Sequence, residues 1–357
     1  MSERLNELNS IRYHYTREFS YPAENYHSKS ESDMYINFNH DHDLVGFIYQ
    51  YKDATSFSIF NNSEIFYGNA QEKTIKMQNQ VTKASFEGQS ALYNSIITLK
   101  NILPLVISDN SIKKAVADTV INRKEFYLLE FETQNKFPNY LGSGFSTTTE
   151  AITFYQKIIV DKLTLLPSAF IQTKKGSEDL NRTDFSNIQI RPALPKENSW
   201  FYSSYLGNYK PEAKQLINRI SVGKIAPDLS LTNLSGTVCN LSQYNGQLIL
   251  LEFWIKNCGY CISAVPKLNA LIEKYKPGNL KVLAINTEDS EQSIRLFTKN
   301  NPVLYDILRS NGADVIKNYG ITAFPQMVLI DKAGMVIYSG DLDVPKIDAL
   351  IDKNVKH

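Results

Sequence analysis

The chain has 357 residues and a mass of 40.6 kDa, about twice the size of one ordinary domain, and this length predicts two folded units. Its composition, 43% hydrophobic and 21% charged, excludes a disordered or collagen-like chain, and its net charge of +1 argues against nucleic acid or an anionic membrane as a partner. Fifteen Tyr and fifteen Phe precede residue 218, whereas six Tyr and three Phe follow it. This uneven distribution of aromatic residues predicts that the two halves of the chain have different architectures.

The first half of the chain has the pattern of an antiparallel sheet. Residues 11–77 alternate apolar and polar positions between turn clusters, which predicts a meander of short strands. In residues 90–106 the apolar positions follow a helical spacing, so a helix is expected to cover one face of the sheet. Further strands are expected at 125–132, 153–161, 163–173 and 182–191. We place this α+β domain at residues 1–200 and a linker with a short helix at 201–219.

Residues 220–357 have the alternating strand and helix pattern of an α/β domain. The almost continuously apolar run 247–254 predicts a parallel strand that is covered on both faces. Helices are expected at 266–275, 291–300 and 344–354, and strands at 280–286, 327–331 and 335–339. The last two strands should form a hairpin.

Neither a membrane span nor a secretory signal is expected in the sequence as given. The longest apolar run is much shorter than the roughly 18 residues that a membrane helix needs. The first ten residues contain no apolar segment and no small-residue cleavage site.

Two of the three cysteines, Cys258 and Cys261, are separated by Gly259 and Tyr260. Three cysteines are too few for a disulfide scaffold or a four-ligand zinc site, so the pair indicates redox chemistry without a metal or organic cofactor. The motif follows the predicted buried strand and opens a helix, where free N–H groups should lower the pKa of the Cys258 thiol. Cys258 is therefore predicted to be the nucleophile. Cys261, one helical turn later, is predicted to be the resolving thiol.

Several segments around this motif resemble the thioredoxin superfamily. The run 253–261 is similar to its strand-to-helix active-site segment, Pro266 lies where that helix has a proline, and Phe324-Pro325 resembles its cis-proline loop. Residues 223–246 are similar to the N-terminal hairpin of the TlpA/ResA branch, which consists of envelope thiol-disulfide oxidoreductases. The resemblance implies a thioredoxin fold with an N-terminal β-hairpin over residues 220–355.

The same resemblance implies a place in the periplasm or cell envelope, client proteins with disulfides or thiols, and an upstream protein that donates or accepts electrons. It assigns client contacts to Trp254, Gly259, Tyr260, Phe324 and Pro325.

The chain departs from the thioredoxin pattern at several positions. Asn257 replaces the usual tryptophan, Tyr260 replaces the usual proline, and Ala264 stands where the branch commonly has a glutamate. Glu252, within the apolar strand, aligns with the buried aspartate of thioredoxin. Because a carboxylate in a core is costly unless it is paired or functional, we hypothesise that Glu252 accepts the proton of Cys261.

Peroxidase chemistry is the competing enzymatic interpretation, because peroxiredoxins share the upstream hairpin. Those enzymes need a threonine three residues before the reactive cysteine and a proline four residues before that threonine. This chain has Ile255 and Leu251 at these positions, which argues against a peroxidase.

Residues 153–188 resemble the last part of the LolA-like half-barrel, a curved antiparallel sheet that shelters lipoprotein acyl chains in that family. The many aromatic residues of the first domain could line an apolar groove for a ligand or partner, or they could simply fill the core of the sheet. The alternative function is therefore a lipid- or lipoprotein-binding envelope protein whose thioredoxin module is a docking platform.

Other reactive side chains have ordinary explanations. His40 and His42 alternate with acidic residues as metal ligands can, but a solvated turn explains them equally well. Cys239 is expected to be a small buried residue of the hairpin strand rather than a resolving thiol.

Overall fold

The computed structural model describes residues 1–38, 44–78, 80–86, 88–148, 151–212, 219–256, 258–275, 280–310 and 313–355. The chain divides into two compact units, Met1–Ala213 and Lys214–His357. His40, His42 and Asn257 lie outside the described residues. None of the described helices has the length and apolar character that a membrane crossing requires.

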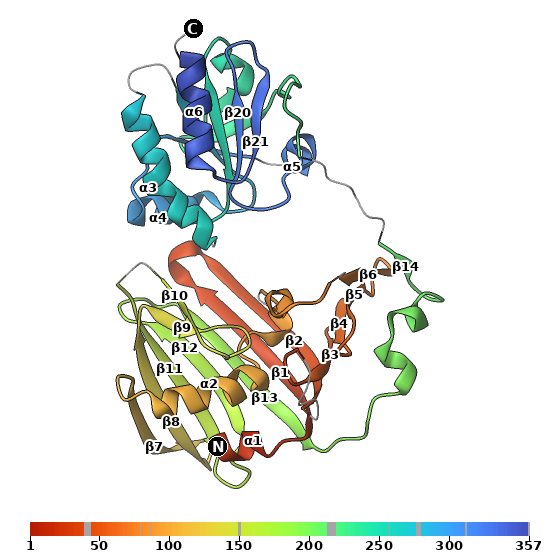
Figure 1. Ribbon diagram of the computed structural model, residues 1–357. Helices are drawn as coiled ribbons and strands as arrows, with labels where there is room; N and C mark the ends of the chain where they lie inside the picture. Colours follow the sequence, from red (N-terminus) through yellow and green to blue (C-terminus); the bar gives the residue numbers. More distant parts are fainter. Residues whose placement is uncertain are drawn as a thin grey trace. The chain divides into compact units, whose positions relative to one another are not determined.

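The first unit is built on one large sheet with the strand order β14-β6-β5-β4-β3-β2-β1-β13-β12-β11-β8-β7 (Figure 1). Its strands are β1 Ser10–Tyr21, β2 Tyr26–Asn37, β3 Ile48–Lys52, β4 Ser56–Phe60, β5 Ile65–Asn69, β6 Thr74–Gln78, β7 Lys113–Ile121, β8 Lys124–Gln134, β11 Thr153–Asp161, β12 Pro167–Lys174, β13 Leu180–Ile190 and β14 Lys210–Pro211. All neighbouring strands are antiparallel except β14 and β6. A separate pair consists of β9 Lys136–Pro138 and β10 Phe145–Thr147.

The predicted meander over residues 11–77 is present as β1 to β6. Its first two strands are twelve residues long each, which is longer than the predicted short strands. The strand β7 was not predicted, because it lies at a sheet edge and most of its side chains are exposed, so its sequence lacks alternation. The described strands form no closed barrel, and the LolA-like half-barrel stays a prediction.

The core of the first unit lies between the sheet and two helices, α1 Ser2–Asn6 and α2 Ile96–Ser108 (Figure 1). Helix α2 begins after Ser95, whose hydroxyl accepts a hydrogen bond from the Thr98 N–H at 3.3 Å. The helix therefore starts six residues later than predicted. Large aromatic side chains are fully buried in this core: Tyr13, Tyr15, Phe47, Tyr49, Phe60, Phe86 and Phe170. This burial favours core packing as the explanation of the aromatic excess.

Residues 197–211 pack on the opposite face of β4, β5 and β6. The ring of Phe57 stacks on Tyr205 with centroids 5.0 Å apart, and Phe66 contacts Tyr202 with centroids 5.9 Å apart. The segment ends in β14, which adds to the sheet beside β6. Residues 201–211 belong to the predicted linker 201–219, and their aromatic side chains fix them to the sheet.

The second unit has a sheet with the strand order β16-β15-β19-β18-β17-β20-β21. Its strands are β15 Ser230–Asn233, β16 Val238–Asn240, β17 Ile249–Trp254, β18 Lys281–Asn286, β19 Asp306–Arg309, β20 Gln326–Ile330 and β21 Val336–Gly340. Its helices are α3 Gly259–Lys274, α4 Glu291–Asn300, α5 Ala313–Tyr319 and α6 Val344–Val355. β17, β18 and β19 are parallel, and β15 and β16 form the predicted hairpin.

The central strand β17 is buried on both faces, as its apolar run predicted. Leu251 and Phe253 face a cluster that includes α5 and the hairpin, whereas Leu250 and Trp254 face α3. Because side chains alternate along a strand, Glu252 points to the face that α3 covers. The strand β19 and the helix α5 were not predicted, since four and seven residues are too short to show a period.

Candidate active site

The loop between β17 and α3 presents Cys258. The N–H of Lys256 donates to Asp289 Oδ2 at 2.7 Å and fixes the loop next to the end of β18. Cys258 is the N-cap of α3, and its Sγ accepts a hydrogen bond from the Cys261 N–H at 3.2 Å. Its thiol donates to the Phe324 carbonyl oxygen at 3.3 Å. A sulfur at a helix N-terminus with an N–H donor is well placed to carry a negative charge.

The two thiols have different surroundings. Cys258 is half-buried, whereas Cys261 is only 1% exposed. Burial raises the pKa of the Cys261 thiol well above its ordinary value, and the hydrogen bond with Cys258 adds to this effect. Cys261 is therefore a neutral thiol at physiological pH and needs a base before it can act as a nucleophile.

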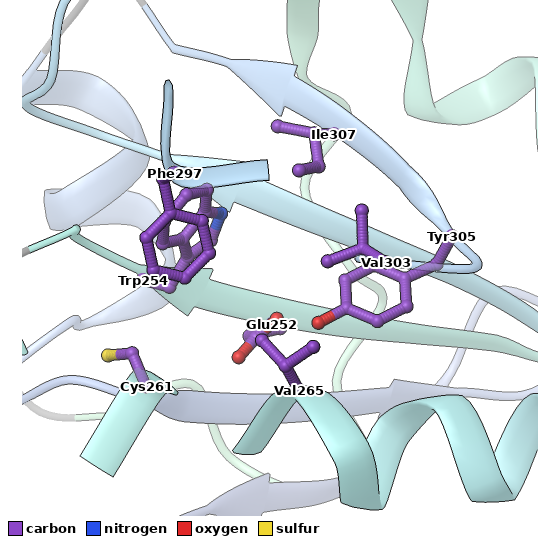
Figure 2. A pocket seen from close by; sticks show the side chains of 8 residues that line it. All are labelled: Glu252, Trp254, Cys261, Val265, Phe297, Val303, Tyr305 and Ile307. Atoms are coloured by element: carbon purple, nitrogen blue, oxygen red, sulfur yellow. The ribbon is translucent and has the colours of Figure 1, made fainter. Parts of the chain in front are cut away.

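Glu252 lies in a narrow pocket between β17 and α3 (Figure 2). Its side chain is 2% exposed, and burial raises the pKa of its carboxyl from 4.5 to about 8, although a hydrogen bond from Tyr305 opposes the shift. The pocket has no room for a water molecule. It is lined by Glu252, Trp254, Cys261, Val265, Phe297, Val303, Tyr305 and Ile307. The carboxyl group and the resolving thiol thus share one dry compartment.

The predicted client contacts are not all at the surface. Tyr260 is 80% exposed, and Phe324 and Pro325 are half-buried, with a cis peptide bond between them as predicted. Trp254 is 2% exposed and packs on Phe297 with ring centroids 4.6 Å apart. Its assignment as a client contact is therefore corrected: it supports the site from the core. Gly259 is the first residue of α3.

Sequence reasoning missed two residues that shape this region. Tyr305 contacts Glu252 from a loop 53 positions later in the chain, and no local pattern marks it. Gln326 is fully buried, and its Oε1 accepts a hydrogen bond from the Thr322 N–H at 3.2 Å beside the cis bond. Cys239 is half-buried in β16 rather than fully buried. The described residues contain no group of three or more His, Cys, Asp or Glu that could hold a metal ion.

Comparison with known proteins finds relatives of the second unit. Residues 222–339 match the model of the AhpC/TSA family. The thiol-disulfide oxidoreductase ResA of Bacillus cereus is 29% identical over 136 residues, which are 38% of this chain and 76% of that protein. ResA of Geobacillus kaustophilus is 32% identical over 117 residues, which are 33% of this chain and 67% of that protein.

Among solved structures, the thioredoxin domain of a thiol-disulfide oxidoreductase from Bacteroides vulgatus matches with a TM-score of 0.35 and 20% identity. The match covers 37% of this chain and 99% of that domain.

The second unit has the parallel strands, the covering helices and the cysteine pair of a thioredoxin-like oxidoreductase. Through this unit the chain belongs to the family of ResA thiol-disulfide oxidoreductases. It is an oxidoreductase.

Proposed function

We propose that the chain exchanges disulfides with client proteins through Cys258 and Cys261. The observation that carries the proposal is the difference between the two sulfurs. Cys258 is partly accessible and accepts a hydrogen bond at a helix N-terminus, whereas Cys261 is buried directly behind it. A nucleophile that a client can reach and a protected resolving thiol are what a two-step exchange requires.

In the proposed reaction the Cys258 thiolate attacks a client disulfide. The Cys258–client bond forms, and the other client sulfur leaves as a thiolate. Cys261 then gives its proton to Glu252, attacks the Cys258 sulfur, and releases the second client sulfur. The enzyme ends with a Cys258–Cys261 disulfide and the client with two thiols, so two electrons pass to the client. An upstream thiol protein would restore the reduced state.

A reduction assay tests the proposal directly. With dithiothreitol as electron donor, the 357-residue chain is expected to accelerate insulin reduction, measured as turbidity. The same protein after alkylation of its thiols with iodoacetamide serves as the control. Turnover of hydrogen peroxide without any insulin reduction would instead favour the peroxidase alternative and overturn the exchange reaction.

Glu252→Gln is expected to slow the resolution of the mixed disulfide by about a hundredfold, which is typical for the loss of a general base. Glutamine keeps the shape of the side chain but cannot accept the Cys261 proton. Stopped-flow measurement of client release from a preformed Cys258–client disulfide gives this rate. Glu273→Gln, at an exposed position of α3, is the matched control and should not change it. An unchanged rate in Glu252→Gln would remove Glu252 from the mechanism.

We also propose that the protein works in the bacterial periplasm or cell envelope. The resemblance to the envelope branch of thioredoxin-like proteins supports this location, and protein disulfides persist in such compartments. Lipid binding is not part of the proposal, because the aromatic side chains that suggested an apolar groove fill the core of the first unit.

A further inference from the structure

Tyr305 approaches Glu252 from the side of the pocket opposite to Cys261. Figure 2 shows the carboxyl group between the two, with the phenol oxygen of Tyr305 directed toward it. Tyr305 precedes β19 by one residue and is only half-buried, whereas Glu252 and Cys261 are almost inaccessible. The phenol therefore lies between the buried carboxyl group and the outer part of the unit.

The other described residues around Glu252 offer its carboxylate no cation, which makes the contact with the Tyr305 phenol important for the charge of this group. Helix α3 contributes Cys261 and Val265, α4 contributes Phe297, and the segment 303–307 contributes Val303, Tyr305 and Ile307. Among the described lining residues, only Cys261 and Tyr305 can titrate apart from Glu252, and none is a cation. A phenol O–H that donates to a carboxylate stabilises the ionised form where no water can do so.

We propose that Tyr305 is a positioning residue that holds the Glu252 carboxylate beside Cys261 and sets the pH at which it takes up the proton. This inference rests on the proposed disulfide exchange. In the resolution step the proton moves from Cys261 Sγ to a Glu252 oxygen, and the new thiolate attacks the Cys258 sulfur. The Cys258–client bond breaks, the client thiolate leaves with the electron pair and takes a proton from water, and Tyr305 keeps its own proton.

Tyr305→Phe tests the inference, because it keeps the ring that fills the pocket and removes only the hydroxyl group. Without the donor, the carboxylate is less stable, so the pKa of Glu252 should rise by about one unit, the size expected for one hydrogen bond to a charged group. Resolution of the mixed disulfide should become about tenfold slower at pH 7. The midpoint of the pH dependence of its rate should rise by about one pH unit. The rate is followed by stopped flow, and the carboxyl group by NMR with ¹³C-labelled glutamate in the full chain.

Two further variants complete the experiment. Tyr275→Phe removes a phenol just after the end of α3 that donates to Asp348 Oδ1 of α6 at 2.7 Å, and it should leave the midpoint unchanged. Adding Tyr305→Phe to Glu252→Gln should slow resolution no further than Glu252→Gln alone. An unshifted carboxyl titration and an unshifted midpoint in Tyr305→Phe would overturn the inference. The titration needs no turnover, so it separates failure of this inference from failure of the proposed exchange.

Discussion

Replacing Cys258 with serine is expected to abolish disulfide reduction, with a loss of at least about a thousandfold in the insulin assay. The reaction requires a sulfur that can form and break a disulfide bond, and a serine hydroxyl cannot do either. The hydrogen bonds from the Cys261 N–H and to the Phe324 carbonyl oxygen can both form with a hydroxyl group, so the local structure should persist. The loss should therefore reflect chemistry rather than unfolding.

Cys239→Ser is the matched control for this experiment. It removes the third cysteine of the chain, in β16, and is expected to leave turnover within about twofold. Cys261→Ser separates the roles of the paired thiols. It keeps the proposed nucleophile and removes the resolving sulfur, so mixed disulfides with the client should accumulate on a non-reducing gel. Turnover in Cys258→Ser, or mixed disulfides that form only in that variant, would reverse the assignment.

The second large effect concerns the stability of the second unit as a function of pH. In the unfolded chain the Glu252 carboxyl ionises near pH 4.5, whereas in the folded protein it keeps its proton up to about pH 8. Between these values the folded state binds one proton more than the unfolded state, so stability falls as the pH rises. The loss amounts to about 4 kcal/mol from this one group by pH 8. Glu252→Gln, which has no ionisable group, is expected to remove this loss.

Urea unfolding of the reduced protein at pH 5 and at pH 8.5 measures this effect. The chain has two tryptophans, Trp200 in the first unit and Trp254 in the second, so a Trp200→Phe background makes the fluorescence report on the second unit. Glu252→Gln should differ little from its parent at pH 5 and should be several kcal/mol more stable at pH 8.5. Glu273→Gln is the control at an exposed position. Equal stability of Glu252→Gln and its parent at both pH values would show that the carboxyl group is not destabilising.

The two expected effects of Glu252→Gln have opposite signs. The variant should be more stable and a slower catalyst, because the same burial that makes the carboxylate costly also raises its pKa into the range where a base is useful. A carboxyl group kept only for packing would show the gain in stability without the loss in rate.

Much of the second unit could be predicted from the sequence. The helix at residues 291–300 and the strand 247–254 were placed within two residues, because each is long enough to show its period or its continuous burial. The elements β19 and α5 were not predicted, because four and seven residues are too short to show a period. In the first unit, β7 was not predicted, because its side chains are mostly exposed and its sequence therefore does not alternate between apolar and polar residues.

The sequence by itself determined the cysteine pair, its place between a buried strand and a helix, and the unusual acid at Glu252. These features are local, and spacing along one strand or one helix end is sufficient to define them. Only the tertiary structure decided that Trp254 is buried, that Tyr305 contacts Glu252, and that residues 197–211 cover the sheet of the first unit. Such contacts join distant parts of the chain, and the packing of apolar faces sets them rather than any local pattern.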